Sequence, residues 1–190
     1  TTQPGFAGTP IIELDGSGAG ADGYGIVIYA GSSKVRGLVI NRFNLTGLDI
    51  DVNGGNVIQG NYIGTDLTGT IDLGNGVNGI SISQGSDNNK IGGTAPGMRN
   101  IISGNGEFGI IIVDSGSTDN VIKGNFIGTD VSGTVDLGNL SVGVGMGFGA
   151  SNNVVGGTEA GSRNIISGND SAGVIIDTIG ATGNIVQGND

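Results

Sequence analysis

Two pairs of aspartates recur at equivalent places in this sequence. Asp66 and Asp72 flank LTGTI in DLTGTID, and Asp130 and Asp136 flank VSGTV in DVSGTVD. Carboxylates, threonine hydroxyls and the carbonyl groups of a glycine turn are hard oxygen ligands suited to Ca²⁺. The spacing makes Ca²⁺ a candidate ligand of both segments, although an EF-hand loop presents a denser ligand set. No other metal or cofactor is expected.

A structural interpretation of the same aspartates stays open beside the calcium one. Asp66 and Asp130 could each cap a turn, while Arg99 and Arg163 lie in the intervening copies of the repeat. Acidic and basic side chains would then alternate along one edge, and each exposed pair would contribute about 0–1 kcal/mol. We favour this charge ladder over the metal site.

The residues for most acid–base chemistry are missing. The chain has no His and no Cys, which excludes a Ser-His-Asp triad, a thiol nucleophile and a thiolate zinc site within it. Asp49 and Asp51 lie two residues apart, a spacing compatible with a glycosidase carboxylate pair. No base neighbours them, so we interpret them as a solvated polar edge. We assign no catalytic residue, and enzymatic activity is not expected.

Four residues are candidates for binding contacts. Tyr62 and Phe126 occupy equivalent positions at the start of the two aspartate segments, and Arg99 and Arg163 occupy equivalent positions in RNIISGN. We expect the two rings to pack over a corner of the fold rather than to stack on a sugar. All four lie in or beside the loops of the long rungs.

Composition narrows the classes of fold and partner. The 190 residues include 42 Gly and have a net charge of -10, with only seven basic residues. Glycine and β-branched residues disfavour helices, and the net charge argues against binding of nucleic acid or of an anionic membrane. Lys34, Arg36 and Arg42 cluster, which predicts a local exposed basic face. No run approaches the roughly 18 apolar residues of a membrane span.

The sequence repeats itself. Residues 56–119 align without gaps on 120–183, an offset of 64 with 35 identities, and Asn184 begins a third copy. Within this repeat, a Gly followed by alternating aliphatic residues recurs at intervals of 22, 32, 30, 34 and 30 residues, and two further short aliphatic runs follow each time. The shortest unit therefore contains three strands in 22 residues, which fits one turn of a coil.

This pattern predicts an all-β, right-handed parallel β-helix of about six rungs, each with three short strands. Residues 1–190 form a single domain, with 1–24 as an entry segment and 25–190 as the rungs. Ile80 and Ile82 should point inward, stacked on Ile110 and Ile112 of the next rung. The extra residues of the long rungs are placed between the second and third strands, so that the loops emerge along one edge.

Several segments are similar to those of known proteins. TTQPGFAGTPIIELDG, VRGLVINRF, GNYIGTD and RNIISGN resemble bacterial secreted and surface proteins with pectate-lyase-like parallel β-helix repeats. The resemblance covers essentially the whole chain and implies an extracellular or cell-surface location. The wider superfamily includes polysaccharide lyases, hydrolases and epimerases, but no catalytic motif of these enzymes is present here.

These observations predict a non-catalytic structural or adhesive module of an extracellular bacterial protein. A regular rod with loops on one edge would act as a stiff spacer, and copies would stack head to tail into filaments. The expected partners are other copies of the chain and surface glycans. The alternative is a polysaccharide-binding or polysaccharide-active module.

Overall fold

The computed structural model describes residues 9–190 as three parallel sheets of six strands each. Sheet A contains β1 (Ile12–Asp15), β4 (Leu38–Asn41), β7 (Tyr62–Ile63), β10 (Ile101–Ile102), β13 (Phe126–Ile127) and β16 (Ile165–Ile166). Sheet B contains β2 (Ile26–Ile28), β5 (Leu48–Asp51), β8 (Ile80–Ser83), β11 (Ile110–Ile112), β14 (Val142–Met146) and β17 (Ala172–Ile176). Sheet C contains β3 (Lys34–Arg36), β6 (Val57–Gln59), β9 (Lys90–Gly92), β12 (Val121–Lys123), β15 (Val154–Gly156) and β18 (Ile185–Gln187). A single short 3₁₀ helix, η1 (Pro96–Met98), completes the described elements.

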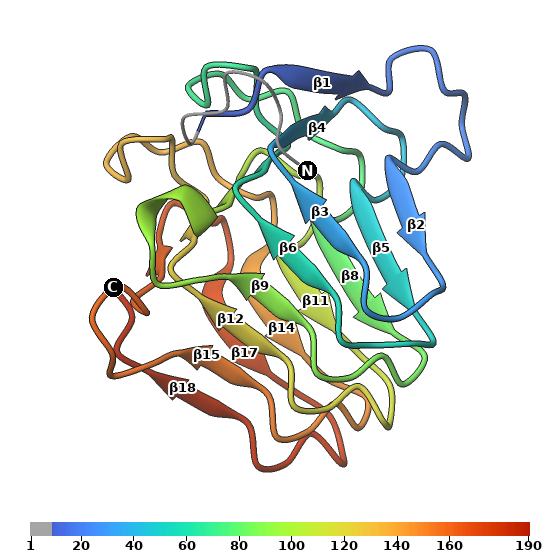
Figure 1. Ribbon diagram of the computed structural model, residues 1–190, viewed down its shortest axis with the longest axis vertical. Helices are drawn as coiled ribbons and strands as arrows, with labels where there is room; N and C mark the ends of the chain where they lie inside the picture. Colours follow the sequence, from blue (N-terminus) through green and yellow to red (C-terminus); the bar gives the residue numbers. More distant parts are fainter. Residues whose placement is uncertain (1–8) are drawn as a thin grey trace.

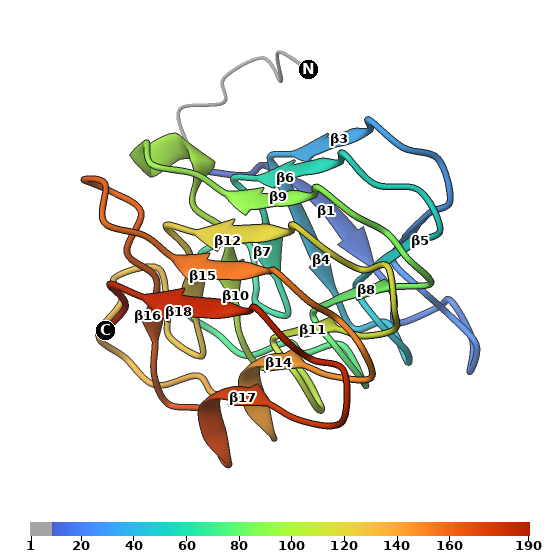
Figure 2. The same ribbon diagram turned by 90° about the horizontal axis from the view of Figure 1, so that it is seen from below.

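The chain visits sheets B, C and A in turn and then begins the next rung. Each strand therefore pairs in parallel with the equivalent strand of the neighbouring rungs (Figure 1). Figure 2 shows the three sheets as the sides of a prism, with sheets B and C on opposite sides of the rod. The parallel β-helix of about six three-stranded rungs is thus confirmed.

The interior is a continuous stack of aliphatic side chains. Ile80 and Ile82 of β8 are fully buried and lie in register with Ile110 and Ile112 of β11, as the sequence predicts. Each strand of sheet C and most strands of sheet A add one inward aliphatic side chain per rung, such as Ile91 and Ile102. Because a single register slip would expose every one of these side chains, the apolar pattern fixes the pairing.

Buried asparagines line all three corners of the prism. The ladder before sheet C joins Asn56, Asn89, Asn120, Asn153 and Asn184; the ladder before sheet A joins Asn61, Asn100, Asn125, Asn164 and Asn189; the ladder before sheet B joins Asn75, Asn105, Asn139 and Asn169. In each ladder the side-chain amide donates to the carboxamide oxygen of the next rung. These bonds satisfy polar groups that the fold removes from water.

The asparagine corners depend on glycine at the preceding strand end. Gly92 has φ +85°, and a Cβ there would lie 2.2 Å from the carbonyl oxygen of Lys123 and 2.3 Å from Oδ1 of Asn125. Only glycine allows both the left-handed backbone and this close approach. A glycine at this strand end is therefore required by the asparagine of the next rung.

The entry segment contributes to the coil. β1 pairs with β4 over Ile12–Asp15, so sheet A begins within the segment 1–24. The TTQPGF motif that supports the family resemblance lies outside the described residues. Among residues 9–190, no helix is long and apolar enough to span a membrane.

The Asn125→Ala variant should be destabilised by about 2–4 kcal/mol. Asn125 Oδ1 accepts from the backbone and side-chain amides of Asn100, and its Nδ2 donates to Asn164 and to the carbonyl of Ile91. Its removal leaves several buried groups without partners, each costing about 1–3 kcal/mol. Urea unfolding measures the loss.

Asn189→Ala is the matched control at the end of the same ladder. Asn189 accepts from Asn164 but is only partly buried. Water can replace its partners, so the loss should be clearly smaller than for Asn125. Equal losses at both positions would contradict the view that burial gives the ladder its strength.

Candidate functional site

Two kinds of loop gather on the sheet A side of the rod. Residues 93–99 and 157–163 lie between sheets C and A, as the sequence predicts. The aspartate segments do not, because Tyr62–Ile63 and Phe126–Ile127 are themselves the strands β7 and β13. The aspartate loops therefore follow sheet A, and the prediction that they precede it is wrong. One kind of loop enters sheet A and the other leaves it, so the two kinds reach the same side of the rod from the two ends of the sheet A strands.

The outward row of sheet A is buried beneath these loops. It consists of Val39, Tyr62, Ile101, Phe126 and Ile165, which form a second apolar cluster. Tyr62 and Phe126 are only 5% and 7% exposed. A Cβ on Gly69 or Gly133 would lie about 3.0 Å from the ring of Tyr62 or Phe126, because these loops fold directly over the rings. The rings pack on the rod as expected and offer no open platform.

Arg99 is the most distinctive side chain of this region. Its guanidinium carbon lies 3.9 Å from the centre of the Phe126 ring, and its Nε donates to the carbonyl of Gly124 at 3.2 Å. Within residues 9–190, no carboxylate forms an ion pair with it. Burial lowers the pKa of Arg99, and the positive charge of Arg163 lowers it further. The terminal nitrogens of Arg99 are thus available to an external acceptor.

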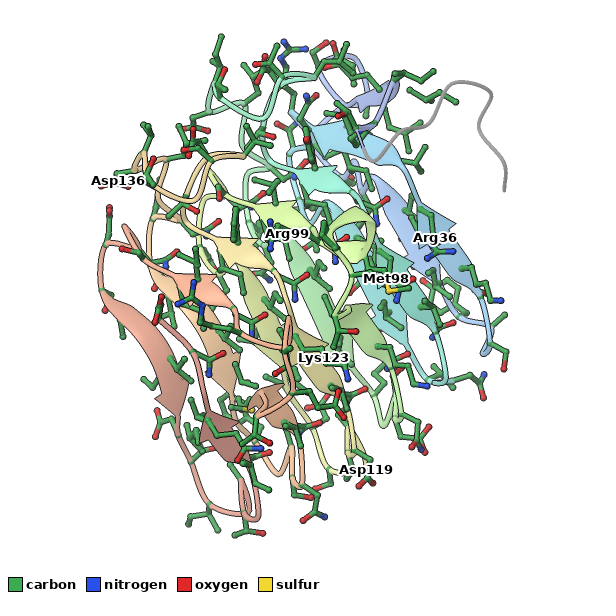
Figure 3. The ribbon with its side chains drawn as sticks, turned by 60° about the vertical axis from the view of Figure 1, so that its left-hand side comes forward. Arg36, Met98, Arg99, Asp119, Lys123 and Asp136 are labelled. Carbon is green, nitrogen blue, oxygen red and sulfur yellow. The ribbon has the colours of Figure 1, made fainter. Side chains whose placement is uncertain are left out.

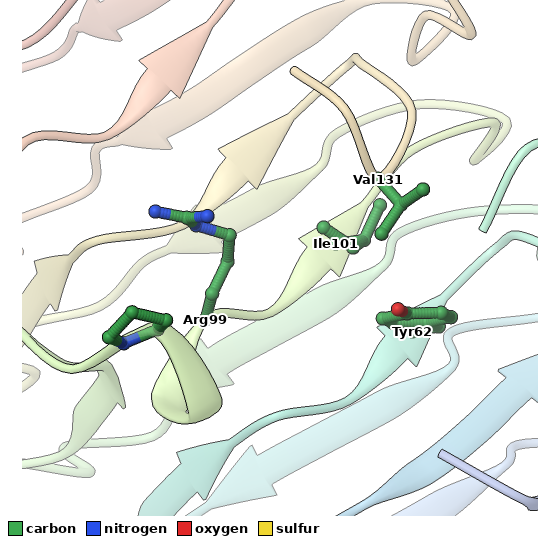
Figure 4. Close-up of a pocket in the computed structure, with 5 residues that line it drawn as sticks. Tyr62, Arg99, Ile101 and Val131 are labelled. Carbon is green, nitrogen blue, oxygen red and sulfur yellow. The ribbon is translucent and has the colours of Figure 1, made fainter. Parts of the chain in front are cut away.

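A small pocket of about 90 Å³ adjoins Arg99. Tyr62, Pro96, Ile101 and Val131 complete its lining (Figure 4). It combines an apolar floor with one cation, and it draws on both kinds of loop. The equivalent Arg163 is more exposed and pairs with Asp190. Of the four predicted contact residues, the structure therefore brings Tyr62, Phe126 and Arg99 together around one place.

The aspartates of the loops act within their own turns. Asp66 Oδ1 accepts from the amides of Thr70 and Ile71, each at 3.0 Å, and Asp130 Oδ1 accepts from Val135 at 3.1 Å. No ion pair among the described residues joins either aspartate to Arg99 or Arg163. The predicted ladder of alternating charges is wrong, because each carboxylate is held by its own loop. The predicted capping role is confirmed.

The calcium hypothesis gains no support from the arrangement of side chains. The part of the chain that the structure describes has no group of three or more acidic side chains that could hold a metal ion. Asp72 accepts from the amide of Gly74 at 2.9 Å, and burial raises its pKa although this hydrogen bond lowers it. Calcium binding by Asp66, Asp72, Asp130 and Asp136 stays a prediction.

Asp49 and Asp51 lie together on the outer face of sheet B. Asp51 accepts from Ser83 and from Nε2 of Gln84, and it is nearly buried. Burial raises the pKa of Asp49, the charge of Asp51 raises it further, and Ser81 opposes the shift. No basic residue occupies an outward position of sheet B. The interpretation of this pair as a solvated polar edge is therefore wrong for Asp51, because its carboxylate is removed from water and held by side chains of the next rung.

An apolar groove that was not predicted from the sequence lies at the other end of sheet B. Phe108, Ile111, Gly145, Phe148 and Ile175 line a hollow of about 100 Å³. Phe148 is 66% exposed and has φ +53°, a conformation that bulky residues rarely adopt. The ring of Phe108 lies over Gly145, where a Cβ would lie 2.7 Å from it. The sequence feature that could have indicated this groove is the run of glycines in GVGMGFG, because residues without side chains leave room on the outer face of the sheet.

Comparison with known proteins gives no match to a family model, to a curated protein or to a solved structure. The resemblance to pectate-lyase-like secreted proteins therefore remains a prediction. Functional conclusions rest on the geometry of the chain itself.

The Asp66→Asn, Asp130→Asn double variant should melt below the unsubstituted protein at neutral pH, by roughly 2–4 °C. Burial raises the pKa of both carboxyls, but hydrogen bonds from the loops outweigh it, so both folded pKa values are lowered. The stabilisation is therefore present above the unfolded pKa of about 3.9 and is lost as the pH falls through the folded values. Thermal melts from pH 2 to pH 7 measure it.

Asp22→Asn provides the control, because Asp22 is exposed in the entry segment. Its melting curve should follow the unsubstituted protein at every pH. A difference between the double variant and the unsubstituted protein that persists undiminished at the lowest pH would contradict a charge-dependent cap.

Proposed function

We propose that this chain is a non-catalytic structural module of an extracellular bacterial protein, a stiff rod that stacks end to end. The observation that carries the proposal is the regularity of the described rungs, whose aliphatic stack and asparagine ladders run along the rod. In the proposed end-to-end contact, the inward side chains of Ile176, 45% exposed, and Val186, 44% exposed, would pack against another copy.

The backbone of the last described rung, β16 to β18, is suited to further pairing. A parallel edge strand presents amide and carbonyl groups that can template another strand. The three ladders end at Asn169, Asn184 and Asn189, whose Oδ1 atoms accept from the preceding asparagines. Their side-chain amides donate to the backbone carbonyls of Ile127, Ala150 and Val155. At the other end, the amides of Ser33 and Leu38 donate to Asn56 and Asn61, so the ladders begin there from backbone groups. The two ends are therefore different, and repeated contact between them would be heterologous and non-closing.

The stiffness of a rod agrees with its interior. Asparagine ladders and aliphatic stacks run along the described rungs without interruption. No convergent cluster of acids and bases competes with this role in residues 9–190. A spacer or adhesive module needs this regularity, and it needs surface contacts rather than a catalytic cleft.

Ile176→Asn should abolish end-to-end association. Ile176 is the exposed inward residue of β17, and a polar side chain there would be buried by an added rung without a designed partner. Light scattering after size exclusion and negative-stain electron microscopy, over a range of concentrations, measure the association. At about 0.5 M ionic strength, where contacts between charged faces are screened, filaments of the unsubstituted protein should give way to single rods in this variant.

Ile175→Asn is the matched control. Ile175 is the preceding residue of the same strand, is 39% exposed and points outward. Filaments should persist in this variant. Discrete single rods of the unsubstituted protein at high concentration would overturn the stacking proposal.

Polysaccharide binding is the second candidate function, favoured by Arg99. Its half-buried guanidinium, stacked on Phe126 beside a small pocket, is held in place before any ligand arrives. A pre-organised guanidinium suits a carboxylate or the hydroxyl groups of a sugar.

Arg99→Gln should reduce saturable binding to an acidic glycan about tenfold or more, because a charge-assisted contact is lost. Arg163→Gln is the control, since Arg163 is exposed and already pairs with Asp190. Calorimetry on a panel of acidic and neutral glycans provides the measurement. Equal affinity of both variants, or no binding to any glycan, would reject this candidate.

A further inference from the structure

The basic residues of this acidic protein gather on one face. Four of the seven, Lys34, Arg36, Lys90 and Lys123, lie on strands of sheet C with their side chains outward. Arg99 and Arg163 lie in the loops that follow sheet C. Figure 3 labels Arg36, Arg99 and Lys123 along this side of the rod. Although the chain has a net charge of -10, this face of the rod is positively charged.

The outward rows of sheet C contain no acidic residue. One row runs Lys34, Val57, Lys90, Val121, Val154 and Ile185 across the six strands. The neighbouring row pairs Arg36 with Gln59, Gly92 with Lys123, and Gly156 with Gln187. The face thus alternates cationic and aliphatic side chains.

Sheet B carries the opposite charge. Its outward rows contain Asp49 and Asp51 and no basic residue; the remaining paired positions are aliphatic, Ser or Gly. Asp177 directly follows β17, and the exposed Tyr29 directly follows β2. Asp49 and Asp51 repel each other without a nearby cation, which together with burial raises the pKa of Asp49.

Asp49, Lys34 and Lys90 form no ion pair among the described residues. Within this part of the chain, Lys34, Lys90 and Asp49 are therefore left without an ionic partner, whereas Lys123 pairs with Glu159. Asp51 is nearly buried and accepts hydrogen bonds from Ser83 and Gln84.

The two faces also match in period and placement. Both are built from parallel strands about 4.8 Å apart, so their rows have the same spacing along the rod. They lie on opposite sides of the rod (Figure 2). Sheet C of one copy can therefore pack on sheet B of the next. In the register that places Lys90 on β9 opposite Asp49 on β5, Val154 on β15 lies opposite Ile111 on β11. Such a contact repeats without closing.

The occupant of the cationic face is better matched by a second copy than by a sugar or a nucleic acid. No outward position of sheet C carries an aromatic ring, which sugars and bases use as a stacking platform. Instead, lysines alternate with valines, which complements a surface that combines carboxylates and aliphatic side chains. Sheet B of this chain is such a surface.

We propose that rods associate side by side, with the cationic sheet C face of one copy seated on the acidic sheet B face of another. In this contact Lys90 of one copy lies opposite Asp49 of the other, and the aliphatic side chains of the two faces exclude water around the pair. This contact goes beyond end-to-end stacking and does not depend on it.

The first test is the dependence of association on salt. Sedimentation velocity over a range of concentrations should show lateral association at about 0.01 M ionic strength and its loss at about 0.5 M, where the Debye length is much shorter. The Ile176→Asn variant should retain this association, which separates it from stacking. Single rods of that variant at low salt would overturn the proposal.

The second test is a pair of charge reversals. Lys90→Glu and Asp49→Lys should each weaken lateral association about tenfold at low salt, because each places like charges across the interface. An equimolar mixture of the two variants should recover it, because every contact in the mixture again has an oppositely charged partner.

Folding of both variants is checked by far-ultraviolet circular dichroism, and the milder Asp49→Asn replaces Asp49→Lys if the latter does not fold. Unchanged association of the Lys90→Glu variant, or no recovery in a mixture of folded reversals, would overturn the proposal. A protein that binds polyglutamate or heparin through sheet C but does not self-associate would also overturn the proposal. The partner of the sheet C face would then be an external polyanion.

Discussion

The stacking of buried asparagines is the interaction on which this fold depends. Every corner of the coil turns the backbone away from a sheet and leaves amide and carbonyl groups inside the rod. A single Asn at each corner satisfies groups of its own rung and of the next, as Asn125 does for Asn100, Ile91 and Asn164. Because unpaired buried groups are costly, the ladder ties each rung to the exact height of its neighbours.

This constraint determines where variation can occur. A rung cannot change length within a sheet without breaking a ladder, so the extra residues of the long rungs leave and return at corners. They then fold back over the outward row of sheet A, where Gly69 and Gly133 contact the rings of Tyr62 and Phe126. Asp66 and Asp130 close these excursions with their own backbone amides. The residues that most resembled a binding motif therefore have a structural role.

The sequence was sufficient to predict the parallel β-helix, because alternation within β8 and β11 and the 64-residue repeat both set the register. It was not sufficient to locate the aspartate loops. β7 is only Tyr62–Ile63, and two residues show no alternation that could identify a strand. The stacking of Arg99 on Phe126 could not be predicted from the sequence either, because it depends on the corner of the coil from which each loop emerges. Lys34, Lys90 and Lys123 became a face only once the register was known.

A ladder-bound rod separates the requirements of folding from those of surface chemistry. Inward positions and corners are fixed by the aliphatic stack and the asparagines, whereas each outward position contributes one side chain per rung and touches mainly the rungs above and below. Charge can therefore accumulate on one sheet without cost to the interior, and the opposite charge can accumulate on another. Residues as distant in sequence as Lys34 and Lys123 then act together, because the period of the rungs places them in the same field. Strands are about 4.8 Å apart on every face, so the rows of side chains on any two faces have the same spacing. Opposite charge on two faces then favours association between copies.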